Sequence, residues 1–194
     1  MTPPNDAPSP TSVGDRIIEA TLTLIARDGL GAVTMSRVAD TAGVSRQTLY
    51  NHYPDVDAIV VEAIARHNRE SIRLLESALQ VVDGPVARLE QLVRHMVSIG
   101  AHAHHAPGLE HGLSPDAQAS LRAYDAALDG CIRDVLDEGR RAGVFRADLD
   151  LEVDTTLTRH LLTSLTQQAA AAPAQAATIA AVGARTLQAA VAAG

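Results

Sequence analysis

The chain has 194 residues, of which 46% are hydrophobic and 20% charged, a composition that supports a folded core and excludes a wholly disordered protein. Sixteen basic residues stand against 23 acidic ones, so the formal net charge is −7 and any contact with nucleic acid has to be local. There is no apolar run of membrane-spanning length, no signal-peptide pattern, and a single cysteine, Cys131, which excludes an intrachain disulfide; we expect a cytoplasmic protein with no membrane partner.

Helix is favoured over sheet because alanine and leucine are abundant and aromatic residues make up only 2% of the chain. Residues 1–12 are rich in proline and polar residues, and we expect them to form a disordered arm. Apolar residues at helical spacing then predict a first helix over 13–28, with Ser12 as its N-cap and Gly29 as its end.

Two short helices follow, over 35–42 and 46–52. Thr34 and Ser45 are their expected N-caps. Gly43 separates them, and glycine there supplies the positive φ that a tight turn between helices needs.

The rest of the chain also predicts helices, each with a start or stop signal of its own. The expected segments are 55–82 after the cap Asp55, a helix from Pro85, one from Ser114-Pro115 to about 141, one from Asp150, and an alanine-rich last helix after Pro173. The sequence therefore predicts an all-α fold of about nine helices.

The two short helices joined at glycine have the form of a helix-turn-helix. Val38, Ala39, Val44 and Leu49 are its expected buried positions. The second helix then presents hydrogen-bonding side chains outward, which suits a helix in the DNA major groove: Arg46, Gln47, Thr48, Tyr50, Asn51 and His52.

At these residues the chain resembles the TetR family of transcriptional regulators. The resemblance rests on Ile17-Ile18-Glu19-Ala20, on Ala42-Gly43-Val44-Ser45 at the turn, and on Thr48-Leu49-Tyr50-Asn51-His52-Tyr53-Pro54. It implies a three-helix DNA-binding domain over 13–60 and a helical ligand-binding and dimerisation domain over 61–194. Such a protein is a regulator and not an enzyme; family habit favours a repressor, although the sequence does not distinguish repression from activation.

The resemblance also implies roles for single residues. Arg46 and Gln47 read base edges. Thr48 and Tyr50 contact thymine methyls or phosphates. The remaining expected DNA-binding residues, most of them phosphate contacts, are Thr34, Ser36, Ser45, Asn51 and His52. Tyr53 is either a packing residue or a further DNA contact.

One departure from the family concerns charge. Val56 occupies the position where the family usually has a lysine that contacts a phosphate. Residues 1–54 contain four arginines (Arg16, Arg27, Arg37, Arg46) against five acids (Asp6, Asp15, Glu19, Asp28, Asp40). We therefore expect DNA binding with a shallow salt dependence.

For the body, the resemblance implies that the last two helices pair with their copies in a homodimer, which would bind a roughly palindromic operator. The middle helices would enclose a pocket for a small-molecule effector that releases the DNA. Its expected lining is aliphatic, although each candidate can equally be ordinary core: Leu92, Met96, Ile99, Leu121, Tyr124, Leu128, Cys131, Leu161 and Leu165.

A histidine-rich segment over 95–111 leaves a metal hypothesis open. His95, His102, His104, His105, Glu110 and His111 are metal-ligand types, but their spacing matches no specific signature, so we assign no metal or cofactor. The sequence contains no phosphate-binding glycine loop and no nucleophile–base pair, so we assign no catalytic residue. A helical adaptor that does not bind DNA is the remaining alternative.

Overall fold

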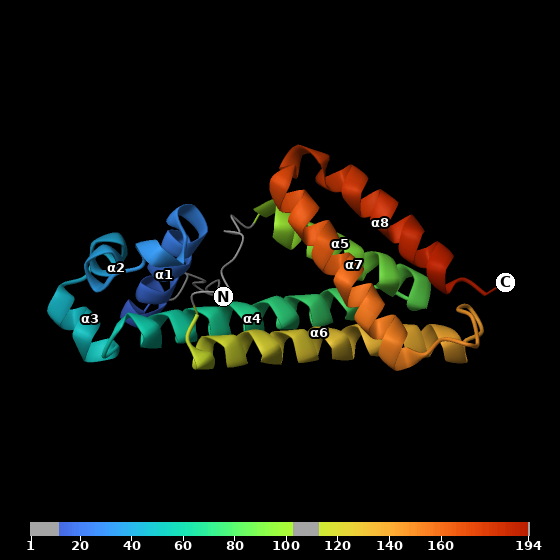
Figure 1. Cartoon of the computed structure of the whole chain (residues 1–194), viewed down its shortest axis with the longest axis horizontal. Helices are drawn as coiled ribbons and strands as arrows, with labels where there is room; N and C mark the ends of the chain where they lie inside the picture. The colour runs from blue at the N-terminus through green and yellow to red at the C-terminus, as the bar shows by residue number, and fades with distance from the viewer. Residues whose placement is uncertain (1–11, 103–112, 194) are drawn as a thin grey trace, which may run out of the picture.

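The computed structural model describes residues 12–102 and 113–193, and within them all regular secondary structure is helical. The elements are α1 (Val13–Asp28), η1 (Leu30–Ala32), α2 (Met35–Ala42), α3 (Arg46–His52), α4 (Val56–Gln80), α5 (Pro85–His102), α6 (Pro115–Arg141), α7 (Leu151–Ala171), η3 (Pro173–Gln175) and α8 (Ala176–Val191) (Figure 1). Extended pairing in this part of the chain is limited to one bridge between Phe145 and Ala192. The all-α prediction is confirmed, with eight α-helices in the described residues where about nine were expected.

Local sequence explains where the helices begin. Each expected N-cap accepts a hydrogen bond from a backbone N–H in the first turn, and these caps are Ser12, Thr34, Ser45, Asp55, Ser114 and Asp150. Ser12 also forms a capping box, because Asp15 accepts from the Ser12 N–H in return. Gly43 ends α2 with φ at 64°, the left-handed conformation predicted for the turn. No helix of the described residues is long and apolar enough to cross a membrane.

The long helix α4 forms the spine of the molecule. One end of α4 carries α1, α2 and α3, and the other end carries α5, α7 and α8 (Figure 1). Helix α6 lies along α4 over much of its length. The helices nearest the N-terminus are therefore held at one extremity, away from the C-terminal helices.

Two buried clusters of side chains form the core. The N-terminal cluster combines residues of α1 to α4 with Leu113, which precedes α6, and with Ala117 in the first turn of α6. The second cluster fills the body between α4, α5, α6, α7 and α8, and Leu75 is the buried contribution of α4 to it. Helices α4 and α6 thus belong to both clusters and connect them.

A close approach between α5 and α7 organises the body. A Cβ placed on Gly100 would lie 2.1 Å from the backbone oxygen of Thr166, so the crossing requires glycine. The Thr166 hydroxyl donates to the Met96 carbonyl at 3.2 Å, which adds a polar contact between the same two helices. Gly183 in α8 approaches Leu165 in α7 with similar closeness.

Arg146 fastens the beginning of α7 to the end of α8. Its backbone N–H donates to Val191 O at 2.8 Å, and its guanidinium donates to Ala190 O at 3.2 Å and to Asp154 Oδ1 at 2.9 Å. Charge-assisted hydrogen bonds of this kind hold both helix ends in one arrangement.

Candidate nucleic-acid interface

The turn between α2 and α3 is built from buried apolar residues on the inner side. Val38, Ala39 and Leu49 are buried in the N-terminal core, and Val44 packs against that core from the turn. The Val44 N–H donates to the Ala39 carbonyl at 3.0 Å, which closes the end of α2. The two helices are thereby fixed relative to each other, as the sequence predicted for a helix-turn-helix.

The other side of α3 is polar and faces solvent. Arg46, Gln47, Tyr50, Asn51 and His52 are exposed, and Tyr50 is exposed to 53%. A binding surface would explain why an aromatic ring is exposed on this polar helix face.

The remaining candidates lie at the helix N-termini. Ser45 accepts from the Thr48 backbone N–H at 3.0 Å, and the two hydroxyls are 2.8 Å apart, so Thr48 is half-buried beside the cap. Thr34 is exposed and accepts from Arg37 N at 3.2 Å, while Ser36 is half-buried in the first turn of α2. The structure therefore places all nine candidate DNA-binding residues on or next to α2 and α3; their individual roles stay predictions.

Two amides on α3 are paired with each other. Gln47 Nε2 donates to Asn51 Oδ1 at 3.1 Å, one helical turn away. The pairing fixes the orientation of both side chains while leaving the Gln47 oxygen and the Asn51 amino group available. An amide presented in this way offers both an acceptor and a donor, the combination that adenine edges require.

Most of the arginines near this surface form ion pairs with an acidic side chain. Asp28 accepts from Arg27 at 2.9 Å and also pairs with Arg37, and these two guanidinium groups lower the pKa of Asp28 to about 2. Arg37 donates further to Ala32 O at 3.3 Å, so it supports the bend after α1. Among the described residues no ion pair is recorded for Arg46, so its charge remains available.

Tyr53 and Val56 both pack against the N-terminal core. Burial raises the pKa of the Tyr53 phenol above its ordinary value, with the Glu62 charge as a further cause. Tyr53 thus makes the core contacts that its interpretation as a packing residue requires. Val56 contributes apolar contact at the beginning of α4, where a lysine would have offered a cation.

The candidate effector-binding residues are divided between the two buried clusters. Leu92, Met96, Leu128 and Leu165 are buried in the body cluster, and packed against it are Ile99, Tyr124, Cys131 and Leu161. Leu121 instead packs against the N-terminal cluster. For Cys131, burial raises the pKa of the thiol, followed by the Glu76 and Asp134 charges, so the thiol stays protonated and unreactive.

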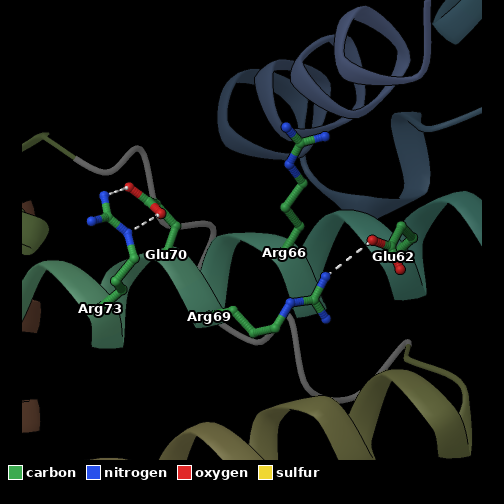
Figure 2. A pocket seen from close by; sticks show the side chains of 5 residues that line it. All are labelled: Glu62, Arg66, Arg69, Glu70 and Arg73. Atoms are coloured by element: carbon green, nitrogen blue, oxygen red, sulfur yellow. Dashed lines mark hydrogen bonds and ion pairs between the residues drawn. The ribbon is translucent and has the colours of Figure 1, made fainter. Parts of the chain in front are cut away.

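Two hollows occur on the surface of α4. The more polar one, of about 680 Å³, is lined by charged side chains of α4: Glu62, Arg66, Arg69, Glu70 and Arg73 (Figure 2). Arg69 pairs with Glu62 at 3.1 Å and Arg73 with Glu70 at 2.6 Å, while Arg66 points toward α1, where it pairs with Asp15. Because every guanidinium there is matched by a carboxylate, this hollow has no excess charge for an anion.

The second hollow is a groove of about 380 Å³ between α4 and α6, and Tyr124 and Ile72 form part of its lining. Sequence reasoning missed both hollows, apart from Tyr124, because periodicity does not reveal which helices lie side by side.

The metal hypothesis concerns six residues, of which the structure describes His95 and His102. Within residues 12–102 and 113–193, no group of three or more metal-ligating side chains comes together. His95 lies inside the body on α5, and His102 is the last residue of that helix. His104, His105, Glu110 and His111 lie outside the described residues.

Comparison with known proteins adds independent information. The family described as "Bacterial regulatory proteins, tetR family" matches residues 17–63, which comprise most of α1, all of α2 and α3, and the beginning of α4. The HTH-type transcriptional repressor KstR2 of Mycolicibacterium smegmatis is 28% identical over 156 residues, which cover 76% of this chain and 75% of that protein.

Solved structures share the whole fold. A TetR-family regulator from Agrobacterium tumefaciens superimposes with a TM-score of 0.80 at 18% identity, over 95% of this chain and all of that one. FadR of Bacillus subtilis, solved in complex with stearoyl-CoA, gives a TM-score of 0.67 at 19% identity over 87% of this chain and 96% of that chain. The helix-turn-helix geometry, the match over residues 17–63 and the shared fold agree: residues 17–63 of this chain are similar to the tetR family of bacterial regulatory proteins, and the whole chain has the fold of such regulators.

Proposed function

We propose that this protein is a homodimeric, ligand-responsive transcriptional repressor that holds a roughly palindromic operator through α3 and releases it when a small molecule occupies the body. The observation that carries the proposal is the exposed polar face of α3, where Arg46, Gln47 and Asn51 project from a helix that Leu49 anchors in the core. The name of the related repressor KstR2 and the stearoyl-CoA complex of FadR are in accord with both halves of the proposal.

In this proposal residues 13–60 form the DNA-binding domain and residues 61–194 the dimerisation and effector domain. The arm expected over residues 1–12 lies outside the described residues except for Ser12, which caps α1. The two buried clusters support such a division, although the beginning of α6 packs with the N-terminal cluster. No catalytic step is assigned to the chain, and the protein acts in the cytoplasm, where its DNA is.

The proposed dimer forms through α7 and α8. Leu157 and Val153 on α7 are exposed to 60% and 53%, and Val182 on α8 to 46%. Solvent exposure of large apolar side chains on two adjacent helices supports their burial against a second copy. The small residues of α8 allow such helices to approach closely.

DNA binding is tested by fluorescence anisotropy with duplexes from the region upstream of the gene. Arg46→Ala is expected to weaken binding to the best duplex by about 1–3 kcal/mol, the usual value for an arginine that contacts a guanine. Arg69→Ala, which removes an equally exposed arginine from α4, serves as the control and should bind as the wild type does. Equal affinity of the wild type and Arg46→Ala, or no binding to any duplex, would contradict the proposal.

Dimerisation is tested by light scattering on the purified protein. Leu157→Asp is expected to yield monomers, because it places a charge in the proposed interface. Val81→Asp is the matched control, since Val81 is exposed to 82% at the end of α4, outside α7 and α8. A dimer that survives Leu157→Asp unchanged would contradict this interface.

A further inference from the structure

A cluster of partly buried polar side chains lies where α4, α5 and α6 meet in the body. Ser71 belongs to α4, His95 and Met96 to α5, and Tyr124 to α6. Their surroundings are apolar, with Leu92 and Leu128 among the buried neighbours that complete the cluster. Polar groups placed in such a core are costly unless each finds a hydrogen-bond partner.

His95 lacks one of its partners. Its Nε2 atom is fully buried and makes no hydrogen bond with the described residues. A hydrogen bond to the backbone of Ser71 uses the ring's other nitrogen, and burial lowers the pKa of His95, so the imidazole is neutral at physiological pH. A neutral ring whose Nδ1–H donates to Ser71 leaves Nε2 with a lone pair and no donor.

The Tyr124 hydroxyl has only a weak acceptor for its own proton. It lies 3.9 Å from Met96 Sδ, and a thioether is a weak acceptor. Burial is the main cause that raises the pKa of Tyr124, and a side-chain hydrogen bond with Ser71, the residue that also holds His95, acts in the opposite direction. The cluster therefore contains a strong acceptor without a donor and a hydroxyl with a weak acceptor.

A route from solvent leads toward this cluster. Tyr124 and Ile72 line the groove of about 380 Å³ between α4 and α6. Tyr124 and His95 both hydrogen-bond with Ser71, so the groove reaches one member of the cluster. The groove is small, which limits the occupant to a compact molecule.

We propose that His95 Nε2 and Tyr124 Oη form the polar end of the effector site, and that they bind the hydroxyl group of an uncharged molecule whose body is apolar. The hydroxyl donates to His95 Nε2 and accepts from Tyr124. This inference rests on the proposed function and names the chemical class of its effector. A carboxylate ligand is disfavoured, because it offers no donor and because Asp125 is the charge that acts on Tyr124.

The test compares three probes that share one body: 4-butylphenol, its methyl ether 4-butylanisole, and the anion 4-butylbenzoate. Calorimetric titration of the protein without DNA is expected to give a Kd for the phenol at least about tenfold below that of the ether, which has no donor for the buried nitrogen. The benzoate is expected to bind more weakly still. With histidine labelled by ¹⁵N, the Nε2 resonance of His95 should move with the phenol and stay unmoved with the ether.

His95→Leu and Tyr124→Phe should each remove the preference for the phenol over the ether, while His67→Leu, the same exchange on the exposed face of α4, should keep it. Tyr124→Phe preserves the ring and so provides the answer if His95→Leu does not fold. Equal binding of phenol and ether by the wild type, absence of binding by any probe at millimolar concentration, or a preference that survives both substitutions would overturn the proposal. The anisotropy assay of DNA binding distinguishes the two proposals. Binding to DNA with equal affinity for phenol and ether would refute this effector site alone, whereas a preference for the phenol without binding to any duplex would refute the proposed regulator function.

Discussion

The crossing of α5 and α7 leads to a quantitative prediction for Gly100→Ala. The added Cβ would lie 2.1 Å from Thr166 O, whereas ordinary contact begins near 3.4 Å. The obstacle is a backbone oxygen that cannot rotate away, so the two helices have to separate by about 1.3 Å locally. Separation also lengthens the hydrogen bond from Thr166 to the Met96 carbonyl.

The magnitude follows from two opposing effects. Overpacking of a core typically costs about 1–3 kcal/mol, and a backbone clash places this site at the upper end of that range. Replacing glycine by alanine inside a helix returns about 1 kcal/mol. We therefore expect Gly100→Ala to lower the free energy of unfolding by about 2 kcal/mol.

Gly130→Ala is the matched control, because Gly130 is an exposed glycine of α6 with nothing within 4 Å of an added Cβ. It should raise the stability by up to about 1 kcal/mol, so the two variants lie on opposite sides of the wild type. Urea denaturation followed by circular dichroism at one fixed protein concentration measures both, and equal slopes show that the same surface unfolds. A Gly100→Ala protein as stable as Gly130→Ala would refute the close approach of the two helices.

Two further predictions concern charge near the DNA-binding surface. Within residues 12–60, Arg16 and Arg46 form no ion pair, so a dimer would bring about four unpaired cations to the DNA. A plot of the logarithm of the DNA association constant against log [salt] should therefore have a slope no steeper than about −4. Anisotropy titrations between low and moderate salt measure the slope, and a much steeper one would mean that other cations reach the phosphates. Asp28, whose pKa Arg27 and Arg37 lower to about 2 from 3.8, contributes stability that is complete above the upper value and disappears as the pH falls toward the lower one. Asp28→Asn should consequently reduce the urea midpoint at pH 7 but make no difference near pH 2, and a pH-independent effect would assign the loss to something other than the ion pairs.

Local features were predictable from the sequence. The caps Ser12, Thr34, Ser45 and Asp55 and the left-handed Gly43 depend on residues within one helical turn, and each occurs where it was expected. The polar face of α3 followed from the same kind of reasoning. Such features need no knowledge of distant parts of the chain.

Features that depend on which helices meet were not predictable. Helical spacing assigns Leu121 to an apolar face but does not say which neighbour covers it, and the structure packs it with the N-terminal core instead of the body. The sequence presents His95 as one of several histidines in a segment rich in metal-ligand types, but in the structure it lies half-buried beside Ser71, which is 24 positions earlier in the chain. The requirement for glycine at position 100 depends on Thr166, which is 66 positions later in the chain.

Because α4 contributes to both buried clusters, a tilt of α4 within the body would move the N-terminal helices with it. Its 25 residues span about 37 Å, so a tilt of about 5° at the body end displaces the opposite end by about 3 Å. A shift of that size is comparable to the spacing between successive base pairs. In the dimer proposed above, a small adjustment around His95 and Tyr124 would therefore be enough to move one α3 out of register with the α3 of the second copy, without any deformation within α1, α2 and α3.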